Sequence, residues 1–244
     1  EADVAVLFCD WRGIPEGGCY SWSDHGRVAA RHRAQAEVSV PRKKNAWARL
    51  VRAKIEGQAS VLENLKIRGS GELLALADQV RSGDPGNVEA QAARLYWSRT
   101  LGRGVGRQPA AGQLIGANAC LDYGYAVLRG HLMRAVLAAG LAPALGVFHR
   151  GRGNAFALAD DLIEPFRPAI DEVALPLPAT ASPSDREVKQ LLVAAASQRF
   201  DADGHGIPAV AEALAQSFGR YIEGDIDRLQ VVSWQGPSRV GVGD

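Results

Sequence analysis

The chain has 244 residues, of which 47% are hydrophobic and 23% are charged, and its formal net charge at pH 7 is +1. This composition is typical of a globular protein, and no apolar run approaches the roughly 20 residues that span a bilayer, so we expect no membrane contact. The three cysteines, Cys9, Cys19 and Cys120, lack zinc-type spacing, which favours a reduced, cytoplasmic setting.

Charge is distributed unevenly along the chain. Residues 1–152 carry 21 Lys and Arg against 13 Asp and Glu, whereas residues 153–244 carry 7 against 14. A basic first half suits a polyanionic partner, and acidic groups further on suit metal binding or simple solvation.

The chain begins with two predicted strands. Residues 3–9 (DVAVLFC) are typical of a buried strand, GIPEGG of a turn, and residues 19–22 (CYSW) of a second short strand. Because two strands alone make no stable sheet, we expect residues 1–26 to be the C-terminal remnant of a small N-terminal β domain. Residues 27–244 are predicted to form an all-helical domain, so the expected fold class is mainly α.

From residue 27 onward the apolar residues have helical spacing. A helix over 27–38 is predicted to end at the Val40-Pro41 junction, and a long helix follows over 44–65. One further helix is predicted from an N-cap at Asn87 through Trp97, another over 115–139 with Gly140 as the stop, and a short one over 143–149. A helix that starts at Asn154 is predicted to be interrupted near Pro165. The last two predicted helices run from a Ser184–Glu187 capping box to about residue 200 and over 208–222.

The segment FHRGRGNAFALADDLIEPFRP, residues 148–168, is the most informative part of the chain. It places His149 ahead of three carboxylates among apolar residues, Asp160, Asp161 and Glu164. Residues 161 and 164 share one face of a predicted helix, and so do residues 160 and 164. Charges on such a stripe are costly to bury unless they are paired or bound to a cation, so the set suggests a hard divalent metal. Ordinary explanations remain open: His149 as a core histidine, and the carboxylates as an exposed face paired with Arg167 or Arg152.

A third carboxylate, Glu89, opens the predicted helix EAQAARLYW. A glutamate in the first turn commonly stabilises the helix dipole. The face that Glu89 shares with Ala92, Ala93 and Tyr96 is otherwise suited to packing, so an inward-pointing carboxylate is the alternative.

Four segments together resemble a known family. EAQAARLYW, ANACLDYGYAVLRGHLMRA, LAPALGVFHR and NAFALADDLIEPFRP have the order and spacing found in the CRISPR-associated integrase of spacer acquisition, the first of the two universal adaptation proteins. The EPFRP ending is similar to the branch found beside type II single-effector nucleases, and PRKKNAWARLVRAKIEGQASVL is similar to the segment that follows the β domain of that family. The resemblance covers residue 3 to about residue 200, and it departs at Asp122, where asparagine is usual.

The resemblance implies a catalytic, metal-binding trio. By motif these positions fall on Glu89, His149 and Glu164, which would hold Mg²⁺ or Mn²⁺, with Asp161 and Asn154 in supporting roles. The chemistry is physically reasonable, because a divalent cation neutralises the charge that a phosphodiester gathers under attack.

The resemblance also implies a function and partners. The chain would be a metal-dependent DNA endonuclease and integrase, in the hydrolase class, that inserts short foreign DNA into a CRISPR array by 3′-hydroxyl attack on a repeat phosphodiester. Expected partners are double-stranded DNA (prespacer and repeat), a second small adaptation protein, and a second copy of the chain, paired through a largely missing N-terminal domain. Because phosphate contacts supply affinity, the candidate DNA contacts are Lys43, Lys44, Arg94, Arg150 and Arg152.

Several alternatives remain open. Each of the five cations is equally compatible with a plain surface charge, and Tyr123 and Tyr125 are compatible with base stacking or with core packing. The chain could instead be a catalytically silent DNA-binding subunit of the same adaptation complex. A third hypothesis is a helical enzyme that uses its metal on a small phosphate ester.

Overall fold

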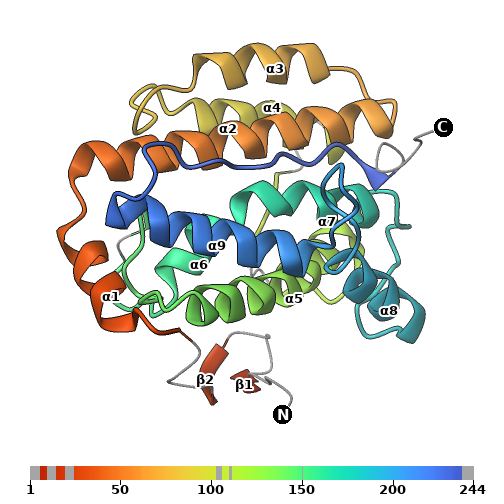
Figure 1. Ribbon diagram of the computed structural model, residues 1–244. Coiled ribbons are helices and arrows are strands. Elements are labelled where there is room, and N and C mark those ends of the chain that lie inside the picture. Colours follow the sequence, from red (N-terminus) through yellow and green to blue (C-terminus); the bar gives the residue numbers. More distant parts are fainter. Residues whose placement is uncertain are drawn as a thin grey trace.

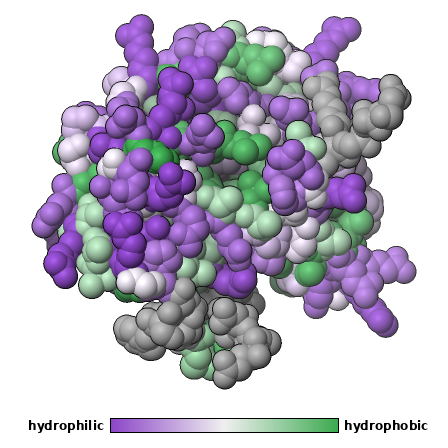
Figure 2. Space-filling model, viewed as in Figure 1, coloured by the Kyte–Doolittle hydropathy of each residue, from purple (hydrophilic) through white to green (hydrophobic). Residues whose placement is uncertain are grey.

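The computed structural model describes residues 6–9, 15–19, 25–102, 106–109, 112–149 and 151–237, and within them the chain is mainly helical (Figure 1). The predicted fold class is therefore confirmed. No helix of the described residues is long and apolar enough to cross a membrane. Hydrophilic side chains cover most of the face seen in Figure 2, and hydrophobic ones gather in smaller patches between them.

The two strands form an antiparallel hairpin at one end of the molecule (Figure 1). Strand β1 spans Val6–Cys9 and β2 spans Pro15–Cys19, with Val6 opposite Cys19. The first predicted strand is confirmed over residues 6–9, and its residues 3–5 lie outside the described residues. The second strand was placed too late, because PEGG belongs to the strand rather than to a turn. Proline is tolerated at the first residue of a strand, where no ladder hydrogen bond needs its nitrogen. Residues 20–22 of the predicted second strand lie outside the described residues.

Helices α1 (Val28–Glu37) and α2 (Val40–Asn64) follow one another with only a short break. The first helix ends close to the predicted residue 38, but the Val40-Pro41 junction is not what ends it. Pro41 lies instead in the first turn of α2, where its missing N–H is not needed. Ser39 caps that turn by accepting a hydrogen bond from the backbone N–H of Arg42 (3.4 Å).

Helix α2 is the long central helix of the structure. Its buried side includes Trp47, Leu50, Ile55 and Val61. Helices α3 (Ser70–Gln79) and α4 (Val88–Thr100) lie along one side of α2, and α9 (Ile207–Glu223) lies on the other (Figure 1). The sequence patterns did not predict α3.

The remaining helices build the second half of the core. Helix α5 (Gly116–Ala138) packs against α9, and α6 (Ala157–Leu162), the 3₁₀ turn η1 (Glu164–Phe166) and α7 (Arg167–Ala174) follow, interrupted at Pro165 as predicted. Helix α8 spans Arg186–Ala195 without the predicted capping box, since the Ser184 N–H donates to Ser182 Oγ (3.2 Å) and Asp185 precedes the helix.

Close approach between α2 and α7 sets the distance across the candidate site. At Gly57, a Cβ atom would lie 2.8 Å from Cγ of Pro168, so only glycine lets the two helices come this near. The extended segment after α9 runs the length of α2. Arg42 donates to the Ile226 carbonyl (2.7 Å) near one end of α2, and Asn64 donates to the Gln235 carbonyl (3.4 Å) at the other.

Candidate active site

Two of the predicted glutamates meet at a lysine that the sequence reading did not single out. Lys54, on α2, places its Nζ 2.6 Å from Glu89 Oε1 and 2.6 Å from Glu164 Oε2. The Lys54 side chain is 13% exposed and that of Glu164 is 6% exposed. Burial alone would lower the pKa of Lys54, but Glu164 and Glu89 outweigh it and raise that pKa, so the ammonium stays charged.

Helix α4 aims Glu89 at this lysine. Its first turn is held by Asp84, whose carboxylate accepts the backbone N–H groups of Val88 (2.8 Å) and Glu89 (3.0 Å). Asn87 stands at the predicted N-cap position, but its side chain does not cap the helix. Asn87 precedes α4 with a left-handed backbone (φ 49°) and contributes no side-chain cap, so Asp84 supplies the oxygens instead.

Glu164 carries a cation on each oxygen. Its Oε1 accepts from Arg167 Nε at 3.0 Å, three residues along the chain, while Oε2 faces Lys54. Burial alone would raise the pKa of Glu164, but Arg167 and Lys54 outweigh it and lower that pKa to about 2. Arg167 was considered above as the partner of an exposed carboxylate face, and the pair exists here on a buried one.

His149 is held by Asp161 from within the protein. Asp161 is fully buried and accepts the backbone N–H groups of Phe148 (3.0 Å) and His149 (3.1 Å), and that of Val147 as well. Its Oδ1 lies 2.6 Å from His149 Nδ1, which leaves Nε2 as the ring nitrogen for a ligand. This hydrogen bond raises the pKa of His149, against the opposing effect of burial.

The same contacts explain why residues 143–149 are not the short helix that the sequence predicted. The N–H groups of Val147, Phe148 and His149 donate to Asp161 instead of to carbonyls of a preceding turn. Gly146 makes this possible, because a Cβ atom there would lie 2.7 Å from the His149 carbonyl oxygen and 2.8 Å from Asp161 Oδ2.

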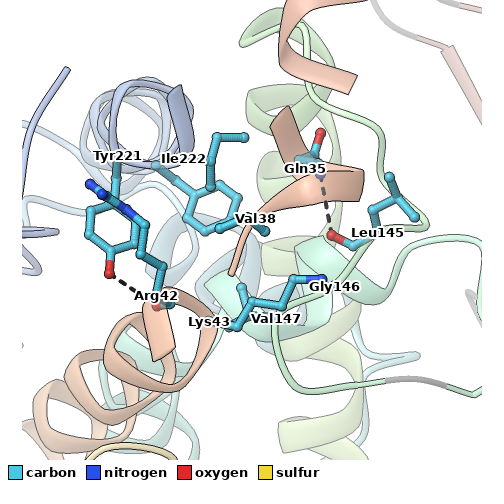
Figure 3. A pocket seen from close by; sticks show the side chains of 10 residues that line it. Gln35, Val38, Arg42, Lys43, Leu145, Gly146, Val147, Tyr221 and Ile222 are labelled. Atoms are coloured by element: carbon cyan, nitrogen blue, oxygen red, sulfur yellow. Dashed lines mark hydrogen bonds between the residues drawn. The ribbon is translucent and has the colours of Figure 1, made fainter. Parts of the chain in front are cut away.

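A second support for this segment comes from α1. The Gln35 amide donates to the carbonyls of Ala142 (3.0 Å) and Leu145 (3.2 Å) and accepts from the Ala142 N–H (2.7 Å). Figure 3 shows Gln35 reaching Leu145 on one side of a small pocket of about 10 Å³, whose other side is formed by α9 and the start of α2. The loop before His149 is thus fixed from two directions.

Asn154 does not contact the predicted trio. Its Nδ2 donates to Asp160 Oδ2 (2.8 Å), and Asp160 also forms a two-point ion pair with Arg129 (2.6 and 3.0 Å). Asn154 Oδ1 accepts the Phe156 N–H (3.0 Å), so the residue organises the start of α6.

A cavity of about 760 Å³ opens beside the two glutamates. Its wall includes Lys54, His149 and Glu164, whereas Glu89 meets it through Lys54. The cationic and aromatic groups on the same wall are Arg107, Arg129, Arg167, Trp97, Tyr123 and Tyr125. The cavity therefore joins the candidate trio to a surface suited to phosphates and to flat, ring-shaped groups.

The predicted DNA contacts that the structure describes do not line this cavity. Lys44, Arg94 and Arg152 are exposed, and Lys43 is half-buried beside the small pocket of Figure 3. Arg150 lies outside the described residues. Sequence reasoning missed the cations that line the cavity, Arg107 and Arg129, together with the role of Lys54.

The trio is only partly converged. Glu89 and Glu164 share one cation, but the ligand atoms of the trio do not all lie within 4.8 Å of one another. Within the described residues, Asp201, Asp203 and His205 are the group that meets this criterion. The carboxylates nevertheless fit a metal, because a positive ion already stands between their oxygens: the Lys54 ammonium marks a position at which a buried and a half-buried carboxylate face one cation.

Comparison with known proteins settles the family. Residues 1–186 match the family described as CRISPR associated protein Cas1. The chain belongs to the Cas1 family. Over 172 residues it is 40% identical to the CRISPR-associated endonuclease Cas1 of Neisseria meningitidis, which is 70% of this chain and 55% of that relative. The chain thus spans about half the length of this Cas1 relative, and the resemblance inferred from the motifs is confirmed.

Solved structures share the fold. A casposase bound to integration product superposes with a TM-score of 0.76 at 18% identity, covering 96% of this chain and 75% of that one. A chain of a partial Cas6-RT-Cas1–Cas2 complex gives 0.73 at 16% identity, covering 96% and 82%. At such identities the likeness concerns the fold alone.

Proposed function

We propose that this Cas1-family chain is a metal-dependent DNA endonuclease and integrase that joins the 3′-hydroxyl of a short DNA to a phosphodiester of a CRISPR repeat. One observation carries the proposal: Glu89 and Glu164 face a single buried cation beside a cavity lined with arginines. The names of two similar proteins, an endonuclease and a casposase bound to integration product, support the same chemistry.

In this proposal Glu89, Glu164 and His149 hold Mg²⁺ or Mn²⁺, which supplies charge neutralisation at the phosphate when bound. Asp161 holds the His149 ring through Nδ1 and so directs Nε2 toward the ligand. Arg107 and Arg129 face the cavity and can bind the flanking phosphates.

The reaction balances as a transesterification. A new P–O bond forms to the incoming 3′ oxygen, the P–O3′ bond of the repeat breaks, and the proton of the attacking hydroxyl ends on the departing 3′ oxygen. With water as the attacking group, the same exchange is hydrolysis, which accounts for an endonuclease activity.

Partners and location follow from the same proposal. The DNA partners would be prespacer and repeat, and a Cas2-like small protein would be the second adaptation protein, as the composition of the complex named above suggests. We also propose residues 1–26 and 27–244 as two units, a homodimer, and a cytoplasmic setting. The pairing of β1 with β2 alone, and the start of the helices at Val28, favour this division within the described residues.

The test is strand transfer of a labelled oligonucleotide into a repeat-containing plasmid. His149→Ala and Glu164→Ala should each lower the rate by a factor of about 100 or more, because each removes a group at the reacting phosphate. DNA affinity, measured by anisotropy, should change little. Lys189→Ala, at an exposed position on α8, is the control and should leave the rate unchanged.

Other outcomes would favour the other candidates. Unchanged strand transfer in both variants would contradict the catalytic assignment. DNA binding without strand transfer by the unaltered chain would favour the silent subunit. DNA affinity that does not fall with salt would favour a small phosphate ester as substrate.

A further inference from the structure

The group that separates the two candidate metal ligands is itself a cation. Lys54 Nζ lies 2.6 Å from an oxygen of Glu89 and 2.6 Å from an oxygen of Glu164, so it stands where a bound divalent ion would have to contact both carboxylates. A divalent ion and an ammonium cannot share that place, because like charges so close together in a buried setting repel strongly.

The charges of the cluster balance without any metal. Two carboxylates, Glu89 and Glu164, face two cations, Lys54 and Arg167. A divalent ion added to this set would leave an excess of two positive charges in a mostly buried site, which is costly. Loading therefore requires one of the resident cations to leave.

Lys54 is the cation that can leave. Arg167 follows Glu164 by three residues, pairs with its Oε1, and stacks its guanidinium 4.6 Å from the ring centroid of Tyr125. Lys54 lines the same cavity of about 760 Å³ but carries a flexible four-carbon stem that ends in a compact ammonium, so its charge has space to move.

A receiving group stands one turn along the same helix. Gln58 lies four residues after Lys54 on α2 and also lines the cavity. Its Oε1 is buried and has no hydrogen-bond partner among the described residues. A buried acceptor without a donor is costly, and an ammonium turned away from the glutamates would satisfy it.

We propose that Lys54 is a built-in counter-ion that keeps Glu89 and Glu164 together in the metal-free protein. On binding, a divalent cation displaces the Lys54 ammonium toward Gln58 and the cavity. This regulation of metal loading rests on the proposed function, since it assumes that the two glutamates are metal ligands. Loading would then do two things at once: it fills the site and presents one more cation to a phosphate in the cavity.

The first test is Mn²⁺ binding to the whole chain, measured from the electron paramagnetic resonance signal of free Mn²⁺. Lys54→Met keeps the apolar stem and removes the competing charge, so the variant should bind Mn²⁺ about tenfold tighter or more than the unaltered chain. In EDTA the same variant should melt roughly 10 °C lower, because the buried Glu164 and the half-buried Glu89 lose their shared partner. Lys189→Met, an exposed lysine on α8, is the matched control and should change neither value.

A second test uses the unaltered chain and so does not depend on the folding of a variant. Acetylation of Lys54 by an excess of an activated acetate ester is followed by peptide mass spectrometry, with Lys189 as the internal reference. Saturating Mg²⁺ should raise the acetylation rate of Lys54 several-fold, because its amine moves from a site that is 13% exposed into the cavity.

The outcomes separate this proposal from the one on which it rests. If the unaltered chain binds Mn²⁺ but Lys54→Met binds it no more tightly, or if Mg²⁺ leaves the acetylation rate of Lys54 unchanged, the counter-ion proposal is wrong and the proposed metal site stands. If neither chain binds Mn²⁺ through Glu89 and Glu164, both proposals are wrong.

Discussion

Two clusters of carboxylates in this chain differ in what surrounds them. Asp201, Asp203 and His205 lie on the turn between α8 and α9, and their ligand atoms all come within 4.8 Å of one another. His205 donates to Asp201 from its backbone N–H (2.8 Å) and pairs with it through Nδ1 (2.8 Å), so the turn largely satisfies itself.

In the cluster around Lys54 the ligand atoms lie further apart, but burying its charges costs far more free energy. Glu89, Glu164 and Lys54 are drawn from three separate elements and are mostly removed from water. Surface carboxylates converge easily because solvent screens them, whereas buried ones converge only where the rest of the fold holds them. Burial and the origin of the groups are therefore better guides to a site than the closeness of ligand atoms.

The largest expected difference between the two clusters is in Mn²⁺ affinity. Glu164→Gln should weaken binding about a hundredfold or more, because it removes a charged ligand from a buried site. Asp203→Asn should leave this binding within about twofold, and the measurement for both is titration of free Mn²⁺. A larger loss in Asp203→Asn would reverse the comparison and locate the metal on the exposed turn.

A smaller difference is expected in the pH dependence of stability. Burial raises the pKa of Asp171 to about 6, although Tyr125 and Tyr96 donate to its carboxylate. The folded state then keeps a proton that the unfolded chain has released, so stability falls as pH rises from about 4 to 6, by about 2 kcal/mol. Denaturant unfolding of Asp171→Asn should lack this fall.

The exposed turn should behave in the opposite sense. Despite some burial, the hydrogen bond from His205 lowers the pKa of Asp201, so its contribution is present above the ordinary pKa of 3.8 and is lost as pH falls below it. Asp201→Asn should therefore lower stability above about pH 4 and have little effect in stronger acid, where the contribution is already lost. A fall between pH 4 and 6 that persists in Asp171→Asn would show that another group causes it.

An effect of similar size is expected at the segment that carries His149. Gly146→Ala should lower the free energy of unfolding by about 1–3 kcal/mol, since its Cβ would meet the His149 carbonyl and Asp161. Strand transfer should fall as well, because His149 is displaced. Gly153→Ala, where a Cβ meets nothing within 4 Å, is the control and should stay within about 0.5 kcal/mol. Equal effects in both variants would mean that the fit at Gly146 has no special role.

Much of the fold could be predicted from periodicity. The long helices α2, α5 and α9 were found because each carries an extended apolar stripe. The prediction of a helix over 143–149 failed because a single distant carboxylate, Asp161, accepts hydrogen bonds from N–H groups of this segment. No local sequence pattern indicates such a contact.

The candidate site was predicted only in part. The motifs named Glu89, His149 and Glu164, and the structure brings the two glutamates together but turns His149 Nδ1 toward Asp161. Lys54 had a signal that was overlooked: it is seven residues from both Trp47 and Val61, on their buried stripe of α2. A lysine at a core position of a long helix indicates a buried anionic partner.

Helix α1 has a consequence that reaches beyond its own packing. Arg31 and Gln35, one turn apart on one face of α1, hold the Ala139 carbonyl and the backbone of Ala142. Together they brace the chain between α5 and His149 from outside the cavity. The same helix thus fixes the chain at Ala139 and at Ala142, so the position of the loop that carries His149 depends on the position of α1.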